Sequence, residues 1–325
     1  MKLVARDLCL IVLALFALNR PASAQSLASL FPSVPPSNHV FIVVEENHGY
    51  NDINALTMPY LTALASQYGL ATNYYGDIHP SIGNYFMLTT GELQTVNDAF
   101  SGVINSDNIV RRLMAAGKTF KEYSESIPFA GYAGGDVFPY VQHHNPLSYF
   151  PEVRNSSSAP FVLVPFSQLG LDIANRQLPN FGFIVPNDLN DAHSGTLQAA
   201  DTWLQTNIAP LIASPQFQQD GVLVIVFDES EFNDFSFGGG HVFMAVVGPK
   251  VKRGYRSTTF YQHQNTLNMM LSALGVTSYP GLSAFAFGMG EFFNASAPAT
   301  ATTSAPAAAP SITIPTSPIG RPSVP

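Results

Sequence analysis

The sequence predicts an α/β fold, a sandwich in which helices flank a mostly parallel central sheet. Short, continuous apolar runs recur along the chain, as expected of strands that are buried on both faces of a parallel sheet. Amphipathic helical patterns lie between these runs, and such alternation is typical of an α/β sandwich. With 46% hydrophobic and 12% aromatic residues, the 325-residue chain can form a large core.

Four apolar runs predict strands, and four amphipathic segments predict helices. The strand runs are Val40 to Val44, Phe181 to Val185, Val222 to Phe227 and Val242 to Val247. The helical patterns are carried by Met58, Leu61, Ala65 and Tyr68; by Ile109, Leu113 and Ala116; by Leu197, Ala200 and Leu204; and by Leu267, Met270, Leu271 and Leu274. In each of these segments the apolar residues recur every three or four positions, which places them on one helix face.

The N-terminus has the pattern of a signal peptide. Lys2 and Arg6 precede an apolar run that ends before Ala22-Ser23-Ala24, so we expect residues 1–24 to be removed and the protein to be secreted or periplasmic. The run is short for a bilayer span, which makes a retained membrane anchor the less favoured alternative.

The remaining chain divides into three parts by composition. Residues 25–37 form a lead-in, and residues 38–294 form the folded domain. Residues 295–325 consist mostly of Ala, Pro, Ser and Thr, a composition that cannot bury enough apolar surface to fold. We therefore expect a disordered tail, with a glycosylated stalk or spacer as the functional alternative.

The charge and the cysteine content exclude two classes of function. With 14 Lys and Arg against 22 Asp and Glu, the formal net charge is −8, so the chain lacks the basic surface that nucleic-acid binding requires. The single cysteine, Cys9, lies within the predicted signal peptide. The mature protein is then expected to have neither a disulfide nor thiol chemistry.

Acidic residues follow three of the predicted strands. Glu45-Glu46 follows the first strand, the segment 187–193 (NDLNDAH) follows the second, and Asp228-Glu229 follows the third. Because ligands of open α/β sheets bind at the carboxyl ends of the strands, we expect these acids to converge on one crevice. Such a cluster repels itself unless a cation lies within it. The alternative is that each acid caps a helix or lies in a solvated loop.

Ser81 is the candidate nucleophile. It follows Pro80 and precedes a potentially helical segment, so it is expected at a helix N-terminus, where the macrodipole favours an anion. A hydroxyl in this position beside a divalent cation can act as a nucleophile near neutral pH. The alternative role is that of an ordinary N-cap serine.

Seven motifs in order give the chain a resemblance to a known family. They are Glu46-Asn47-His48, His79-Pro80-Ser81 through Asn84-Tyr85, His143-His144-Asn145-Pro146, Asn190-Asp191-Ala192-His193, Asp228-Glu229, Gly240-His241-Val242 and Tyr261-Gln262-His263. Over about residues 38–276 the chain resembles the bacterial phosphoesterase family of acid phosphatases and phosphatidylcholine-type phospholipases C, within the alkaline-phosphatase-like superfamily. The resemblance implies a three-layer alkaline-phosphatase-like sandwich and a covalent phospho-enzyme formed by Ser or Thr.

The resemblance also implies a ligand set for a divalent metal ion, which could be zinc, calcium, manganese or magnesium. The implied ligands are Glu46, Asn47, Asp228 and Glu229, and Ser81 is the implied nucleophile. Adjacent residues of a strand point to opposite faces, so Glu45 and Glu46 cannot both enter the site, and the resemblance selects Glu46.

The histidines have several possible roles. We expect His193 or His241 to assist the leaving oxygen. The expected substrate-binding residues are His79, Asn84, His144 and His263. In two-metal members of the superfamily, the second ion would fall to Asp191, His193 and His263. In one-metal members these histidines would bind phosphate instead.

The favoured function is an exported, metal-dependent phosphomonoesterase of the acid-phosphatase type. A phospholipase C or phosphodiesterase is the nearest alternative, so the partner is a small phosphoester or a phospholipid headgroup. An inactive surface or binding protein on the same fold is the alternative of another class. The aromatic residues Phe232, Phe235, Phe237 and Tyr255 lie near the Gly238–Gly240 run in the sequence. We interpret these aromatic residues as burying a long loop, and a substrate-covering loop is the alternative.

Overall fold

A computed structural model describes residues 32–154 and 156–294, so the predicted signal peptide and tail lie outside the described residues. The strands are β1 (Val40–Glu45), β2 (Gly69–Ala71), β3 (Phe120–Ser124), β4 (Leu163–Pro165), β5 (Phe181–Val185), β6 (Val222–Phe227), β7 (Met244–Val247) and β8 (Tyr255–Ser257). The α-helices are α2 (Pro59–Gln67), α3 (Ile82–Thr90), α4 (Ile109–Ala115), α5 (Pro151–Arg154), α6 (Ala159–Val162), α7 (Ser167–Ala174), α8 (Leu197–Ala213), α9 (Pro215–Asp220) and α10 (His263–Ala273). Within these ranges, no helix is both long and apolar enough to cross a bilayer.

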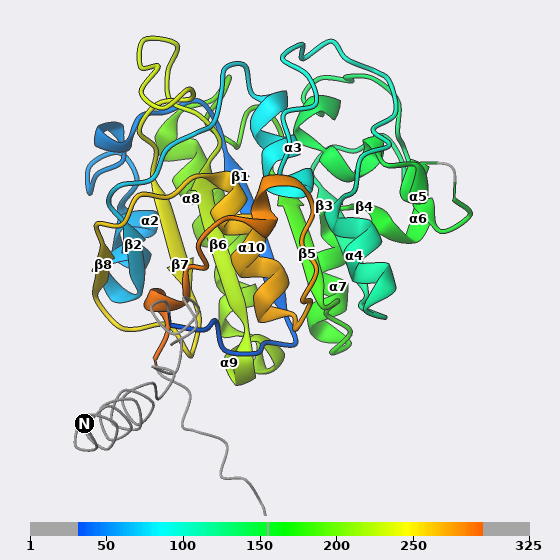
Figure 1. The fold of residues 1–325 in the computed structure, drawn as a ribbon. Helices are drawn as coiled ribbons and strands as arrows, with labels where there is room; N and C mark the ends of the chain where they lie inside the picture. The colour runs from blue at the N-terminus through cyan, green and yellow to red at the C-terminus, as the bar shows by residue number, and fades with distance from the viewer. Residues whose placement is uncertain (1–31, 155, 295–325) are drawn as a thin grey trace, which may run out of the picture. The chain divides into compact units, whose positions relative to one another are not determined.

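The eight strands form one sheet in the order β4-β3-β5-β1-β6-β7-β2-β8 (Figure 1). β1 lies between β5 and β6 and is parallel to both, and β3 is parallel to β4 and β5. Only the pairs that β7 makes with β6 and β2 are antiparallel among the ladders described. The prediction of a mostly parallel sheet is therefore confirmed.

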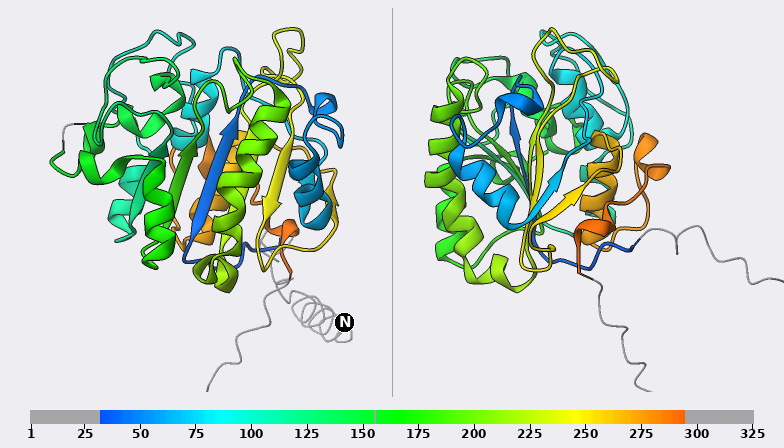
Figure 2. Two further views of the ribbon diagram at one scale, coloured as in Figure 1. Left: turned by 180° about the vertical axis from the view of Figure 1, so that it is seen from behind. Right: turned by 90° about the vertical axis from the view of Figure 1, so that its left-hand side faces the viewer.

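Helices cover both faces of the sheet and make it the middle of three layers. The side view in Figure 2 shows α10 and α3 on one face and α2 with α8 on the other. α3 packs against α10, and α8 packs against both α2 and α7. All six residues of β1 and all six of β6 are buried, as two helical layers require of a central strand.

The sequence predicted the central strands but not the short ones. The runs that became β1, β5, β6 and β7 were identified, although β7 begins at Met244 rather than Val242. The strands β2, β3, β4 and β8 were missed. Three of them have three residues each, and β3 (FKEYS) contains charged residues in place of an apolar run. These strands form through pairing with their neighbours, a tertiary effect that local periodicity does not record.

Candidate active site

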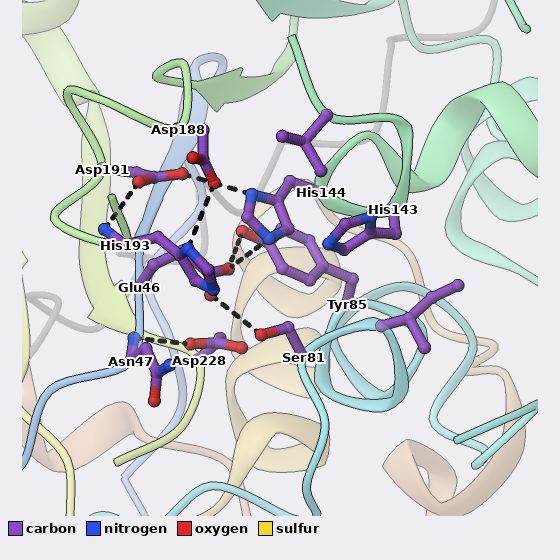
Figure 3. Close-up of polar contacts among 12 residues, drawn as sticks. Glu46, Asn47, Ser81, Tyr85, His143, His144, Asp188, Asp191, His193 and Asp228 are labelled. Atoms are coloured by element: carbon purple, nitrogen blue, oxygen red, sulfur yellow. Dashed lines mark hydrogen bonds and ion pairs between the residues drawn. The ribbon is translucent and has the colours of Figure 1, made fainter. Parts of the chain in front are cut away.

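The acids that follow the strands meet at the carboxyl end of the sheet. Glu46 follows β1, Asp191 lies in the loop after β5, and Asp228 follows β6 directly. Because β1 is the neighbour of both other strands, its following residue lies at the centre of the cluster. Figure 3 shows these three carboxylates around Ser81 and His144. Glu46 rather than Glu45 faces Ser81, as strand alternation requires.

Ser81 is the N-cap residue of α3, but its hydroxyl makes no capping hydrogen bond. Its Oγ instead donates toward Glu46 Oε2 at 2.9 Å and lies 3.2 Å from Glu229 Oε1. Ser81 is also nearly buried, with 4% of its surface exposed. Its side chain therefore faces a cluster of carboxylates, and the role of an ordinary capping serine does not describe it.

The second oxygen of Glu46 accepts a hydrogen bond from a tyrosine and lies beside a histidine. The Tyr85 hydroxyl donates to Oε1 at 2.5 Å, and His144 Nε2 lies 3.3 Å from the same atom. The rings of Tyr85 and His144 stack, with centroids 5.1 Å apart and an interplanar angle of 10°. This stack fixes the orientation of the Glu46 carboxylate relative to Ser81.

Two oxygens beside Ser81 are buried without a hydrogen-bond partner. They are Asn47 Oδ1 and Asp228 Oδ2. The other oxygen of Asp228 accepts the Asn47 backbone N–H at 3.3 Å, and Asn47 has a positive φ of 59° that turns the chain after β1. A buried acceptor without a donor is unfavourable unless a cation satisfies it. The oxygen donor set of Glu46, Asn47, Asp228 and Glu229 therefore fits a hard divalent cation.

The pKa values of the clustered carboxyl groups also favour a bound cation. Burial raises the pKa of Glu46 well above its ordinary value, and the charges of Asp228 and Asp191 raise it further. Burial, followed by the Glu229 charge, also raises the pKa of Asp228 well above its ordinary value. Without a cation, these buried carboxyl groups cannot all be ionised at once, because each negative charge raises the pKa of its neighbours. A cation among them would let all of them ionise.

A second group of metal-type ligands lies beside the first. His144, Asp188 and Asp191 are buried, and each offers one ligand atom within 4.8 Å of the others. His144 Nδ1 is 3.2 Å from Asp191 Oδ2. Burial lowers the pKa of His144 well below its ordinary value, so the imidazole is neutral and can act as a ligand or hydrogen-bond donor. Burial also raises the pKa of Asp191 to about 8.

His193 lies at the edge of this second group. Its Nδ1 is 3.3 Å from Asp188 Oδ1, and 39% of its side chain is exposed. Its ring meets that of His144 edge to face, with centroids 6.0 Å apart. Asp188 thus orients an imidazole that is open to solvent beside the buried cluster.

Two predicted site histidines lie in surroundings that do not match their predicted roles. In His263, Nε2 is 2.6 Å from the backbone carbonyl of Asp228 and Nδ1 is 3.0 Å from the Tyr74 hydroxyl. Because both nitrogens are engaged, His263 braces the Asp228 backbone and is not free to ligate a second metal or to bind phosphate. Burial lowers its pKa to about 4, which keeps the ring neutral.

His241 is the second histidine whose surroundings differ from its predicted role. Its ring stacks on Tyr50 and Tyr75, with centroid distances of 4.4 Å and 4.9 Å. Its Nε2 lies 3.1 Å from the backbone carbonyl of Thr72, the residue after β2. These contacts place His241 in an aromatic stack, so His193 is the better placed of the two candidate proton donors.

His79 contacts one of the clustered carboxylates, Glu229. His79 Nδ1 lies 2.9 Å from Glu229 Oε2, and its Nε2 lies 2.9 Å from the Asp234 carbonyl. Burial lowers the pKa of His79, but the bonds to Glu229 and the Asp234 carbonyl, together with the charges of these two acids, outweigh burial, and the pKa is raised.

Asn84 holds the turn that leads to Ser81. Its Oδ1 accepts the backbone N–H groups of Asp77 and Ile78 at 2.9 Å and 3.2 Å, and its Nδ2 donates to the Ile78 carbonyl at 2.7 Å. The second Nδ2 donor reaches Glu229 Oε2 at 3.4 Å, so all of the amide's contacts are within the protein and one of them is to the carboxylate cluster. We therefore assign Asn84 to positioning Ser81 rather than to the substrate contact that the resemblance implied.

Sequence reasoning missed Tyr85 and Asp188 as site residues. Tyr85 lies four residues after Ser81 on α3, a spacing that places both side chains on one helix face and was available in the sequence. Asp188 lies three residues before Asp191 in the same loop. It lies near His144 of η3 (Gln142–His144) because its backbone N–H bonds the Pro139 carbonyl, a contact between distant segments that no local pattern indicates.

The loop between β6 and β7 corrects one interpretation. Its phenylalanines do not bury the loop, because Phe232, Phe235 and Phe237 are 66%, 58% and 63% exposed. Backbone bonds hold the base of the loop, where Gly239 N–H donates to the Gly76 carbonyl at 3.1 Å and Gly76 N–H donates to the Gly240 carbonyl at 3.0 Å. The loop is therefore anchored at its base and presents its rings outward.

The three-layer α/β sandwich is a fold that known proteins share. A structure described as a protein in the alkaline phosphatase superfamily from Vibrio parahaemolyticus superposes with a TM-score of 0.54 at 11% identity, covering 76% of this chain and 69% of that one. This likeness shows the fold. The predicted alkaline-phosphatase-like architecture is confirmed.

Sequence comparisons identify the family. The Phosphoesterase family model matches residues 54–277, and the chain belongs to this family. It is 32% identical over 257 residues to a probable acid phosphatase of Kluyveromyces lactis, covering 76% of this chain and 61% of the relative. It is 27% identical over 249 residues to a phosphatidylinositol-3-phosphatase of Mycobacterium tuberculosis, covering 75% of this chain and 79% of that one. The chain thus spans about three fifths of the length of its yeast relative.

Proposed function

We propose that this protein is a metal-dependent phosphoester hydrolase that acts on phosphomonoesters, with Ser81 as the nucleophile. The observation that carries the proposal is the position of the Ser81 hydroxyl, 2.9 Å from Glu46 and 3.2 Å from Glu229 at the N-terminus of α3. Membership of the Phosphoesterase family supports the same reaction. The names of the relatives, acid phosphatase and phosphatidylinositol-3-phosphatase, favour monoesters over diesters.

In the proposed reaction, Ser81 Oγ attacks phosphorus, and the bond between phosphorus and the alcohol oxygen breaks. The Ser81 proton passes to a carboxylate oxygen of Glu46 or Glu229, both of which already accept from this hydroxyl. The leaving alcohol takes a proton from His193, which Asp188 orients through Nδ1. Water then attacks the phosphoserine and gives a proton to His193, and the bond between phosphorus and Ser81 Oγ breaks. Inorganic phosphate leaves, and the carboxyl group returns its proton to Oγ, which restores the Ser81 hydroxyl.

Glu46, Asn47, Asp228 and Glu229 are the residues that would hold the divalent cation, and they fit it because two of their oxygens are buried without partners. When bound, the cation supplies positive charge to the phosphate oxygens and favours the ionised serine. Tyr85 orients Glu46 through its hydroxyl, His144 stacks on the Tyr85 ring, and His79 contacts Glu229. The protein's own residues thus preset the carboxylates around Ser81 before substrate arrives.

The experiment that tests this function is hydrolysis of p-nitrophenyl phosphate by the purified protein before and after chelation. We expect turnover that chelation reduces and that a divalent metal restores. Ser81→Ala should lower kcat by more than about a thousandfold while the metal content stays unchanged, because the hydroxyl is the proposed attacking group. Absence of turnover on any phosphoester with metals supplied would remove the enzyme proposal.

Two further measurements refine the proposal. Metal analysis of the isolated protein separates a single ion at the Glu46 cluster from two ions, of which the second would lie at His144, Asp188 and Asp191. A comparison of p-nitrophenyl phosphate with bis-p-nitrophenyl phosphate and phosphatidylcholine separates a monoesterase from a diesterase or phospholipase C.

Export is the other part of the proposal. The charged start, the apolar run and Ala22-Ser23-Ala24 support removal of residues 1–24. N-terminal sequencing of protein recovered from the periplasm or medium tests it. We expect Gln25 as the first residue, and an intact Met1 would contradict cleavage.

A further inference from the structure

The loop from Asp228 to Phe243 and the segment beside it expose four phenylalanine rings. We call this surface the aromatic rim, and its members are Phe232, Phe235, Phe237 and Phe260. Their exposed fractions are 66%, 58%, 63% and 39%. Figure 1 shows the loop, coloured yellow-green, protruding beyond the carboxyl end of the sheet. Exposed aromatic rings that gather in this way mark an interaction surface rather than ordinary surface variation.

The four rings of the aromatic rim form two contacting pairs, and one pair packs against His79 beside the candidate active site. Phe232 and Phe235 meet edge to face at 5.3 Å, and each lies 4.9 Å from the ring of His79. Phe237 packs against Phe260 at 4.7 Å and Tyr75 at 4.6 Å. Since His79 also bonds Glu229, only one side chain separates the first pair from the carboxylate cluster. Whatever covers the rim therefore lies next to the site.

The shape and charge of the rim decide what it fits. The three rings of the protruding loop are more than half exposed, so a small ligand would cover them on one side only, whereas a lipid surface can surround them. Beyond the buried Asp228 and Glu229, the loop contains Glu231 and Asp234 but no Lys or Arg, and the Glu231 side chain is 50% exposed. Anionic lipids would repel these charges, while choline headgroups present a positive end toward them.

We propose that the aromatic rim docks the protein on a zwitterionic lipid surface of the phosphatidylcholine type. The rings enter the boundary between headgroups and acyl chains, and Glu231 stays at the level of the choline groups. Docking in this way brings the Ser81 site to the lipid surface. The proposal concerns binding, so it can succeed or fail independently of the hydrolase reaction.

Co-sedimentation of the purified full chain with phosphatidylcholine vesicles tests the proposal. We expect wild-type protein to sediment with the vesicles, and each Phe→Ser change at 232, 235 or 237 to lower the partition coefficient about tenfold. The matched control is Phe161→Ser, which removes a ring that is 72% exposed on α6, away from the rim, and should bind as wild type does. Ser81→Ala should also bind normally, which separates docking from catalysis.

Four results would overturn the proposal. They are wild-type protein that stays in the supernatant, a triple variant that binds as tightly as wild type, binding that requires added phosphatidylserine, and self-association of the wild type in sedimentation velocity that the triple variant loses. Circular dichroism and thermal midpoints establish that the variants are folded. If the triple variant is unfolded, Phe237→Ser alone decides the result, because its ring contacts Tyr75 and Phe260 at the surface and not His79.

Discussion

Tyr85→Phe is the sharpest test of how the candidate site is built, because it removes one hydroxyl and keeps the ring. The hydroxyl donates to Glu46 Oε1 at 2.5 Å, and a hydrogen bond to a charged group contributes about 1.5–3 kcal/mol. The other carboxylate oxygen, Oε2, still accepts from Ser81 at 2.9 Å, so Glu46 keeps one of its two hydrogen bonds. If the whole loss falls on the transition state, kcat/KM for p-nitrophenyl phosphate drops about 10- to 100-fold, mainly in kcat.

The matched control is Tyr123→Phe. Tyr123 is equally buried, and its hydroxyl donates to the Asp172 carboxylate at 2.6 Å, but its contacts lie between β3 and α7. This variant should lose a similar amount of free energy of unfolding and keep its kcat/KM. The reasoning is refuted if Tyr85→Phe stays within about twofold of wild type, or if Tyr123→Phe loses as much activity as Tyr85→Phe.

Three further outcomes are expected. Glu122 is buried on β3, and burial raises its pKa to about 8 from an ordinary 4.5, so the folded protein keeps a proton that the unfolded chain releases between these values. The contribution of Glu122 to the free energy of unfolding should therefore fall by about 4 kcal/mol as the pH rises from 4.5 to 7.5, and in urea titrations Glu122→Gln should lose that much less stability than wild type over this range. Asn84→Ala leaves the N–H groups of Asp77 and Ile78 without their acceptor, so it should cost about 2–4 kcal/mol of stability and lower kcat. Asn108→Ala, which removes the N-cap of α4, should cost about 1 kcal/mol and spare kcat, and equal loss of activity in both variants would contradict the assignment of Asn84. His193→Gln should slow phenyl phosphate more than p-nitrophenyl phosphate, since the poorer leaving group needs the proton more, and equal slowing would remove His193 as the proton donor.

The sheet and the first half of the candidate site could be predicted because they depend on local chemistry. A strand covered by helices on both faces must be apolar throughout, so VFIVV and VLVIVF identify β1 and β6 without further information. The residue that follows such a strand lies at the carboxyl edge of the sheet. This rule places Glu46 and Asp228 together, and strand alternation distinguishes Glu46 from Glu45.

The histidines could not be assigned in the same way, because the role of an imidazole depends on what its two nitrogens meet. His263 and His144 both lie in family motifs, yet His263 bonds Tyr74 and the Asp228 carbonyl, whereas His144 faces Glu46 and Asp191. These partners are more than thirty residues away in sequence in every case. Periodicity and motif spacing carry no information on such contacts.

The sequence by itself determined the fold class, the strand-end acids and Ser81 at the start of a helix, because each follows from the spacing of apolar and polar residues along one element. Only the tertiary structure decided which groups share a site. It places Tyr85 and His144 beside one oxygen of Glu46 and Asp188 beside His193. It also shows that His263 and His241 contact backbone carbonyls and that the loop phenylalanines are exposed. The physical reason is that hydrogen bonds and burial act between elements that are distant in the chain, and packing settles them only when the sheet has brought those elements together.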